Sequence, residues 1–277
     1  MEKKKWVLLV SVNPGGPNGG SGTKYFIGDF NGSKFKSDWP AEKEVWLDHG
    51  KDNYAGVTWS NEPNNEISRT YLGWMSNWQY ANVVPTEAWR GTMTLPRGLT
   101  LWTNENGKKR LKASLVENLD KIAGEWQSIG SNISASGGSK KLPFNLENVS
   151  ACQFTLKLET PENSVSNIEL SNPEGNKVII TLDRSENKVT FDRRKSGKTD
   201  FSENFPGVFP APWDFKNTTT LNIIVDQSSI ELFVDEGRLQ MTHLVFPKSI
   251  LGQIKIAETD NASILSARAR ELKSIWK

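Results

Sequence analysis

The stretch WLDHGKDNYAGVTW, residues 46–59, brings together side chains that could bind or transform a polar ligand. Within seven positions it offers two carboxylates, an ammonium group and a phenol, on Asp48, Asp52, Lys51 and Tyr54. Because a sugar hydroxyl both donates and accepts hydrogen bonds, this mixture suits a polyhydroxylated ligand. A solvated turn between two strands has the same composition, so the spacing alone leaves both interpretations open.

The stretch WMSNWQY, residues 74–80, adds flat aromatic faces beside amide groups. Trp74 and Trp78 are four positions apart, and even spacing on an extended strand places both side chains on one face. Asn77 and its polar neighbours interrupt what would otherwise be an apolar packing surface. Aromatic rings with amide donors beside them can hold the apolar face of a sugar ring and fix its hydroxyls. Core packing of the two tryptophans is the alternative interpretation.

The elements that must position these side chains have the pattern of short β-strands. Apolar segments of strand length lie at 5–12 and 23–30, and further ones follow at intervals of about ten residues, at 44–50, 54–61 and 69–78. An Asn-Gly pair at 31–32 predicts a hairpin after the second of these segments. The repeated aromatic residues and glycines favour propeller blades, although no clean internal repeat is present.

The second half of the chain has a different composition. Eight of the 11 tryptophans and all four tyrosines lie in the first 102 residues. From about residue 126 onward, alternating strands with Asn, Asp, Gly and Ser turns follow one another closely, which is the pattern of an antiparallel β-sandwich. We expect a strand and a short helical turn within 108–124, and a domain boundary between residues 115 and 130. The last segment, 264–276, is expected to be a strand or a short helix.

The composition excludes several classes of function. Lys+Arg 34 against Asp+Glu 32 leaves a net charge of +2, so no nucleic-acid partner is expected. No apolar run approaches the roughly 18–20 residues that span a bilayer, and no signal peptide is recognised, so we expect a soluble chain of unassigned location. One cysteine, Cys152, and two histidines, His49 and His243, offer no disulfide framework and no multi-histidine metal site.

Longer segments closely resemble glycoside hydrolase family 32, which contains invertases, levanases and exo-inulinases. WMSNWQY followed by VPTEAWRGTMTLPRGLTL resembles the fifth-blade segment of that family, and WLDHGKDNYAGVTWSN resembles its fourth-blade stretch. KKWVLLVSVNPGGPNGGSGTKYFIGDFNGSKF is similar to the segment that follows its third catalytic motif. In the second half, VTFDRRKSG and IIVDQSSIELFVDEGRLQMTHLVFP resemble its C-terminal β-sandwich. The resemblance covers nearly the whole chain, in family order.

The resemblance implies an all-β fold with two domains. Residues 1–120 would form part of a five-bladed β-propeller, roughly blades three to five, and residues 121–277 an antiparallel β-sandwich. The family's nucleophile (in a Trp-Met-Asn-Asp-Pro-like motif), stabilising Asp (Arg-Asp-Pro) and acid/base (Glu-Cys-Pro) do not occur in this sequence. The chain starts just after the point where Glu-Cys-Pro would end, so the earlier blades are expected to be absent. Because retaining glycosidases need two carboxyl groups about 5–5.5 Å apart, we expect no catalytic residue here and no hydrolysis by this chain alone.

The resemblance also implies which residues bind the substrate. Asp48 and Lys51 match fourth-blade positions that border the pocket in family members, although His49 replaces the usual aromatic residue. The segment KDNYAG also has one residue more before its tyrosine than some members have. Trp74 matches the tryptophan that lines the fructose pocket. The expected supporting wall consists of Tyr54, Asn77 and Trp78.

Three functions remain open on the sequence. The first is the C-terminal part of a β-fructofuranosidase that acts on sucrose, levan or inulin, with retention and release of fructose. For this function the resemblance implies neither a metal nor an organic cofactor. The second is a non-catalytic carbohydrate-binding or structural module. The third is one half of a split enzyme, in which a partner chain supplies the missing blades or copies of this chain associate.

Overall fold

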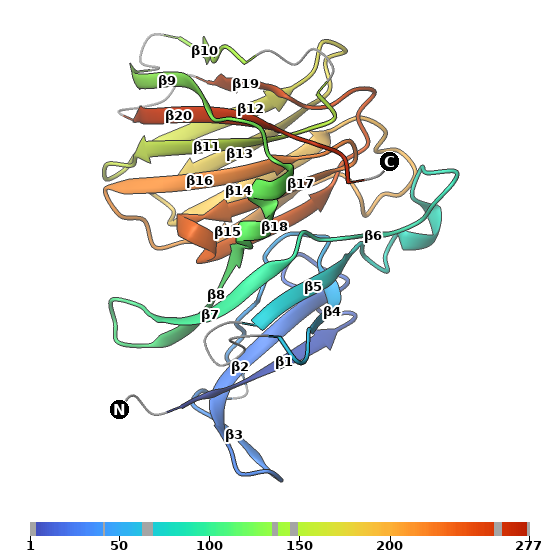
Figure 1. Cartoon of the computed structure of the whole chain (residues 1–277), viewed down its shortest axis with the longest axis vertical. Coiled ribbons are helices and arrows are strands. Elements are labelled where there is room, and N and C mark those ends of the chain that lie inside the picture. The colour runs from blue at the N-terminus through green and yellow to red at the C-terminus, as the bar shows by residue number, and fades with distance from the viewer. Residues whose placement is uncertain are drawn as a thin grey trace.

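The chain folds into β-sheets joined by loops and short 3-10 turns, in two groups that lie one above the other in Figure 1. The computed structural model describes residues 4–40, 42–62, 69–134, 138–144, 149–257 and 262–275. All the residues predicted to bind a ligand lie within these ranges. In the described part of the chain, no helix is both long and apolar enough to cross a membrane.

Two antiparallel sheets form the lower group. The first contains β1 (Trp6–Val12), β2 (Gly22–Phe30) and β3 (Phe35–Ser37), in that order. The predicted hairpin at the Asn-Gly pair is confirmed, because β2 and β3 pair across it. The second sheet has the order β4 (Tyr54–Thr58), β5 (Arg69–Met75), β7 (Arg97–Thr103) and β8 (Lys109–Leu115), with β6 (Thr92–Met93) paired to β5. These two sheets share a small aromatic and aliphatic core that includes Tyr25, Ile27, Tyr71 and Leu99.

Two six-stranded antiparallel sheets form the upper group. One has the order β10 (Lys140–Lys141), β19 (Gln253–Ile256), β12 (Val165–Ser171), β13 (Lys177–Asp183), β14 (Lys188–Lys195) and β15 (Val208–Pro212). The other has the order β18 (Leu239–Leu244), β17 (Ser229–Val234), β16 (Thr218–Val225), β11 (Ala151–Glu159), β20 (Ser263–Leu272) and β9 (Gln127–Ser134). The last segment of the chain is therefore a strand, one of the two alternatives predicted.

Alternating sequence explains how these two sheets pack. Along β13, residues alternate between buried and half-buried positions, with Val178, Ile180 and Leu182 turned inward. Such alternation places one face of a strand against a core. The buried faces of both sheets contribute to one large apolar cluster, which also contains the single cysteine, Cys152. Burial raises the pKa of the Cys152 thiol, so it is a structural thiol in this fold.

One predicted strand is not a strand. Residues 44–50 form only a single bridge, between Trp46 and Lys24, and the segment then leaves the lower sheet. From His49 onward it runs beside β18, where the His49 amide donates to the carbonyl of Gln240 and the Asp52 amide to that of Thr242. The apolar and polar residues of this segment therefore do not alternate across one sheet, because its backbone contacts first β2 and then β18. It forms the main polar junction between the lower and upper groups of strands.

The connection between the two groups follows the prediction made for it. β8 ends at Leu115, and a 3-10 turn, η2 (Glu117–Ile122), leads to β9. Two further 3-10 turns, η1 (Ala81–Val83) and η3 (Asp235–Gly237), follow β5 and β17. η3 packs close to β8, so it adds a second contact between the groups.

Candidate functional site

The aromatic residues predicted to hold a sugar lie together on one surface. Tyr54 on β4 faces Trp74 on β5 in the strand register, with ring centroids 6.2 Å apart. The Trp74 and Trp78 centroids are 5.0 Å apart, and Trp78 is 51% exposed. β5 ends at Met75, so Trp78 belongs to the following turn rather than to the extended strand that was predicted. The three rings nevertheless form one accessible surface, which we call the aromatic platform.

Gly91 fixes the position of Trp74 within the aromatic platform. Its backbone φ of +75° lies in the left-handed region, where glycine has no steric penalty. A methyl group at this position would lie 2.5 Å from Nε1 of Trp74. The indole therefore packs directly on the backbone of Gly91, and its orientation depends on the absence of a side chain there.

Asp48 is buried, and five hydrogen bonds surround its carboxylate. Oδ1 accepts from the backbone amides of Gly50 at 2.7 Å and Thr242 at 2.9 Å. Oδ2 accepts from Asn53 Nδ2 at 3.1 Å, Arg97 Nη1 at 2.7 Å and the Thr242 hydroxyl at 2.5 Å. The predicted role of Asp48 in contacting a ligand is not favoured by these surroundings, because no oxygen of the carboxylate is left for a sugar hydroxyl.

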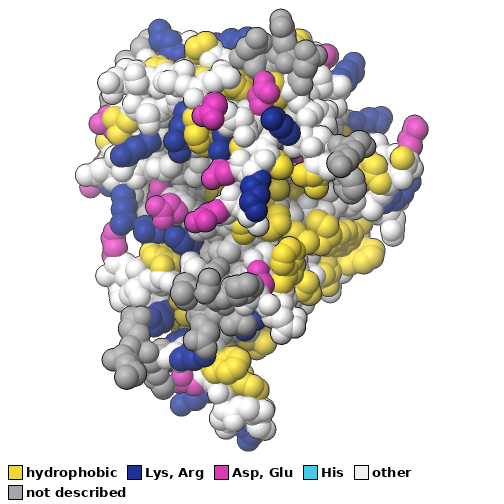
Figure 2. Space-filling view, in the orientation of Figure 1, with side chains coloured by type: hydrophobic (Ala, Val, Ile, Leu, Met, Phe, Trp, Pro, Cys, Tyr) yellow, Lys and Arg dark blue, Asp and Glu magenta, His cyan; other side chains and the backbone are white. Residues whose placement is uncertain are grey.

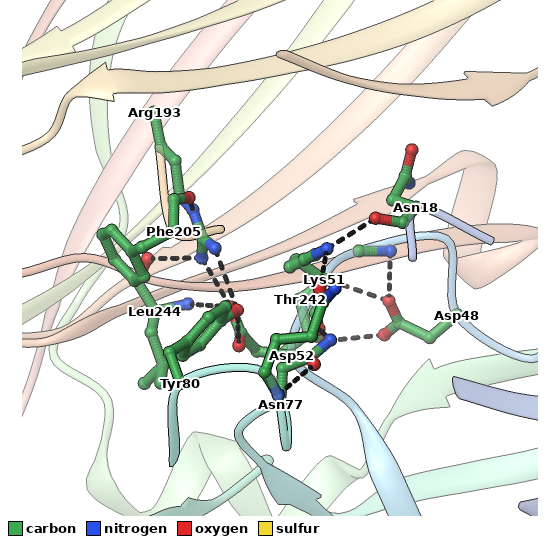
Figure 3. A network of polar contacts seen from close by, with 12 residues as sticks. Asn18, Asp48, Lys51, Asp52, Asn77, Tyr80, Arg193, Phe205, Thr242 and Leu244 are labelled. Atoms are coloured by element: carbon green, nitrogen blue, oxygen red, sulfur yellow. Dashed lines mark hydrogen bonds and ion pairs between the residues drawn. The ribbon is translucent and has the colours of Figure 1, made fainter. Parts of the chain in front are cut away.

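Asp52 forms a second buried junction, shown with the first in Figure 3. Its Oδ2 accepts from Arg193 Nη1 at 2.6 Å and from the Leu244 amide at 2.9 Å, and the Tyr80 hydroxyl donates to Oδ1 at 2.5 Å. Arg193 also donates through Nε to the Phe205 carbonyl at 2.7 Å. Asp48 and Asp52 lie four positions apart in the loop, and each therefore binds a buried arginine and a backbone amide of β18.

The electrostatics of the first junction keep Asp48 ionised. Burial alone would raise the pKa of Asp48, but the charge and hydrogen bonds of Arg97 outweigh it and lower the pKa to about 2. Arg97 also donates to Glu231 Oε2 at 2.7 Å, and burial raises the pKa of Glu231. A carboxylate held ionised in this way has no proton to give, so Asp48 cannot be a general acid at neutral pH.

Lys51 and Asn77 hold the glycine-rich connection between β1 and β2. Lys51 Nζ donates to the carbonyls of Asn18 at 2.6 Å and Gly19 at 3.2 Å, and to Gln79 Oε1 at 2.6 Å. Asn77 Nδ2 donates to the carbonyls of Lys51 at 2.9 Å and Gly19 at 3.3 Å. Burial lowers the pKa of Lys51 to about 8. Both residues therefore hold the loop that adjoins the aromatic platform.

The structure thus divides the predicted residues into two sets. The exposed or half-buried set is the aromatic platform, and the buried, hydrogen-bonded set consists of Asp48, Lys51 and Asn77. Sequence reasoning missed Arg97, Arg193 and Tyr80, which complete the buried set. A signal was present, because Arg193 continues the inward-facing parity of Val189 and Phe191 along β14. Within the described residues, no group of three or more His, Cys, Asp or Glu side chains is placed to hold a metal ion.

Two family models together match nearly the whole chain. Residues 1–114 match the family description "Glycosyl hydrolases family 32 N-terminal domain", and residues 116–271 match "Glycosyl hydrolases family 32 C terminal". The chain belongs to glycosyl hydrolase family 32.

Similar proteins include a levanase and an exo-inulinase. A levanase of Bacillus subtilis is 36% identical over 289 residues, which cover 99% of this chain and 41% of that protein. An extracellular exo-inulinase of Aspergillus awamori is 31% identical over 290 residues, which cover 98% of this chain and 52% of that protein.

The fold of the chain also matches solved structures of similar proteins. The crystal structure of the Aspergillus awamori exo-inulinase matches with a TM-score of 0.84 and 27% identity, over 100% of this chain and 55% of that one. A fructofuranosidase of Schwanniomyces occidentalis complexed with fructosylnystose matches with a TM-score of 0.80 and 26% identity, over 99% of this chain and 57% of that one. The chain therefore spans about half the length of the relatives that it matches.

Proposed function

We propose that this chain is the C-terminal part of a β-fructofuranosidase-type hydrolase, and that its aromatic platform is one wall of the sugar site. The observation that carries this proposal is the grouping of Tyr54, Trp74 and Trp78 at centroid distances of 6.2 and 5.0 Å on a family 32 chain. Adjacent, partly exposed rings of this kind suit the apolar face of a furanose ring. The substrates would be sucrose, levan or inulin, cleaved with retention of configuration and release of fructose.

In this proposal, residues 1–120 are blades of an incomplete five-bladed propeller and residues 121–277 are a β-sandwich. The three- and five-stranded sheets with their own small core support the first part. The two six-stranded sheets around one cluster support the second. The turn η2 between them supports a boundary near residue 120.

The buried residues would act on the sugar site indirectly. Lys51 and Asn77 hold the loop beside the aromatic platform, and Asp48 holds the segment that carries Lys51. Direct contacts with a sugar would come from the aromatic platform and from groups outside this chain.

We expect the chain alone to release no fructose. Asp48 and Asp52 are the carboxylates nearest to the proposed site in sequence, and each is bound by an arginine. A nucleophile and a proton donor on opposite sides of the scissile bond are required for retention, and two arginine-bound carboxylates do not provide them.

The proposal is tested by two measurements on the purified chain. Fructose release from sucrose, levan and inulin should be undetectable, and intrinsic tryptophan fluorescence should change when fructo-oligosaccharide is added. Trp78→Ala should weaken the binding by about tenfold, while Trp59→Ala, which removes an indole that is 48% exposed outside the platform, should not. Release of fructose by the chain, or equal binding by both variants, would contradict the proposal.

A second candidate is a split enzyme completed by another chain. β1 pairs with β2 alone among the described strands, so one of its edges is open. Trp6, Leu8 and Phe30 on this first sheet are exposed by 50, 41 and 39%. Figure 2 shows a further hydrophobic area over the region of β5 and β6, where Trp89 and Met93 are exposed by 43 and 50%. An open strand edge and apolar faces of this kind favour association.

For this candidate, the partner that covers the open strand edge and the apolar faces is a chain that carries the other propeller blades of a family 32 enzyme. Light scattering on the purified chain gives its mass in solution, and co-expression with the N-terminal part of a family 32 enzyme tests completion directly. Fructose release by the mixture, and by neither chain alone, is the expected result. A monodisperse monomer that gives no complex and no activity with such a partner would contradict it.

A further inference from the structure

A pocket whose lining contains no residue of the aromatic platform lies on the outer face of the upper group of strands. It has a volume of about 330 Å³ and lies over β20, β11 and β16, between η2 and η3. Figure 2 shows side chains of both charges gathered on this face. We call it the outer-face pocket. Its polar lining includes Asp120, Trp126, Asn222, Glu236, Arg268 and Arg270.

Trp126 orders two guanidinium groups in the outer-face pocket. Arg268 and Arg270 lie two positions apart on β20, on one face of the strand. Their guanidinium carbons lie 4.1 and 4.3 Å from the centroid of the Trp126 ring. Stacking of this kind restricts a long side chain, so the donors are held in place before any ligand binds.

The two arginines differ in what they already bind. Arg270 donates through Nε to Gln153 Oε1 and through Nη2 to Asp120 Oδ1, both at 2.7 Å. Arg268 has the Trp126 ring as its contact and no ion pair among the described residues. Arg270 is therefore a fixed part of the wall, whereas the planar fork of Arg268 is available to a ligand.

Amide donors and carboxylate acceptors complete the outer-face pocket. Asn222 Oδ1 accepts from the Thr155 hydroxyl at 2.7 Å, which turns the oxygen of that amide away and leaves its NH₂ group for a ligand. Asp120 keeps one oxygen, since only Oδ1 accepts from Arg270. Glu236 is exposed and accepts from Lys112 Nζ at 3.2 Å. Donors and acceptors therefore alternate around the pocket.

The charge of the lining selects the chemical class of the ligand. The two arginines and two carboxylates of the lining balance one another, and Lys112, which pairs with Glu236, adds one positive charge at the edge, so the outer-face pocket has mixed charge and no strong field of either sign. A neutral molecule with many hydroxyl groups uses both donors and acceptors, because each hydroxyl makes both kinds of hydrogen bond. The volume is at the small end of ligand pockets, which suits one or two sugar units of a longer chain.

We propose that the outer-face pocket is a second sugar-binding site, which takes a short stretch of a neutral fructan chain. The identity of the sugar rests on the function proposed above, whereas the geometry requires only a neutral polyhydroxylated ligand. A site on the upper strands would hold a polymeric substrate while its end is processed elsewhere. The structure therefore gives these strands a binding role in addition to a supporting one.

The test is a calorimetric titration of the purified 277-residue chain with inulin- and levan-derived oligosaccharides. Trp126→Ala and Asn222→Ala should each weaken binding at one of two sites by about tenfold or more, the size expected when a hydrogen-bonding network is broken. Arg268→Gln provides a third variant that leaves the Trp126 ring in place. Trp59→Ala is the matched control, since it removes an exposed indole from another surface. Circular dichroism establishes that each variant is folded.

The outcomes separate this proposal from the function proposed above. Loss of one site in Trp126→Ala and of the other in Trp78→Ala supports both. Loss only in Trp126→Ala supports the outer-face pocket and contradicts the aromatic platform. Unchanged binding in all three pocket variants, or binding of inorganic phosphate in place of sugar, overturns the outer-face pocket.

Discussion

Asp48 and Thr242 lie 194 positions apart in the chain, yet two hydrogen bonds join them. The backbone amide of Thr242 donates to Oδ1 of Asp48 at 2.9 Å, and its hydroxyl donates to Oδ2 at 2.5 Å. Arg97, from β7, meets the same carboxylate at 2.7 Å and the Thr242 hydroxyl at 2.5 Å. Segments from three parts of the sequence therefore share one buried polar cluster, and it joins the lower and upper groups of strands.

Arg97 is the residue whose loss should weaken this junction most. Arg97→Met leaves Asp48 and Glu231 buried without their shared cation. Breaking a buried pair by removal of one partner costs about 3–5 kcal/mol, because a charge stays buried without compensation. Urea denaturation of the variant should show a loss of this size in the free energy of unfolding.

A surface pair provides the control for Arg97→Met. Lys216 and Glu105 also form an ion pair, at 2.9 Å, but their side chains are 54 and 77% exposed. Lys216→Met should change the free energy of unfolding by less than about 1 kcal/mol. Equal effects of the two substitutions would show that the Arg97 cluster does not stabilise the junction.

Gly50 allows the loop to approach β18 closely. A methyl group at this position would lie 2.1 Å from the backbone nitrogen of Thr242 and 2.2 Å from its carbonyl oxygen. Neither atom is on a flexible side chain, so Gly50→Ala must displace backbone, at a cost of about 1–3 kcal/mol or more. Thermal denaturation should show a lower Tm. Gly124→Ala is the control, because its methyl group would meet only ordinary contacts at 3.8 Å and beyond; a similar loss in both would argue against the close approach.

Much of this arrangement follows from local sequence, and part of it does not. The strands of the upper sheets were predictable because each places its apolar residues on one face, as Val178, Ile180 and Leu182 do on β13. The hairpin after β2 was predictable because an Asn-Gly pair prefers a tight turn. Residues 44–50 were not, because the backbone of this segment first bonds to β2 in the lower group and then, from His49, to β18 in the upper group, which local sequence does not reveal.

The candidate site divides in the same way. Trp74 and Trp78 could be grouped from their spacing, since their contact is local. The surroundings of Asp48 could not, because Thr242 comes from the other end of the chain. A loop with carboxylate, ammonium and phenol groups has the same sequence pattern whether these groups bind a ligand at the surface or a buried arginine from a distant part of the chain. Only the fold decides which of the two holds.

His243 should make the stability of the chain sensitive to mild acid. The ring is buried and stacked between Phe191 and Phe209, at centroid distances of 4.0 and 5.1 Å, and neither nitrogen has a hydrogen-bond partner in the described part of the chain. Burial lowers the pKa of His243 well below its usual value, and the Arg193 charge adds to this. The unfolded chain therefore takes up a proton below about pH 6.5 that the folded chain does not bind, and stability is lost as the pH falls through this range.

Replacement of the ring removes this effect. If His243 stays neutral in the folded chain down to pH 5, the free energy of unfolding falls by about 2 kcal/mol as the pH decreases from 6.5 to 5. His243→Phe should remove this part of the decline, with little change at pH 7, because no hydrogen bond is lost. His243→Leu is a second variant for the case in which the larger ring does not fit. Urea midpoints between pH 7 and 5 provide the measurement, and an unchanged slope in both variants would contradict the assignment to His243.

Gly91 offers the sharpest test of the aromatic platform, because it alters the orientation of Trp74 without removing an aromatic ring. Gly91→Ala places a methyl group 2.5 Å from Nε1 of the indole, which must move. Gly107 is a close match, since its φ of +70° is nearly the same and nothing lies within 4 Å of a methyl group there. Both substitutions carry the penalty of a left-handed backbone, about 1–2 kcal/mol. Only Gly91→Ala should also weaken fructo-oligosaccharide binding, by about tenfold in a fluorescence titration; equal affinities for the two variants would remove Trp74 from the sugar site.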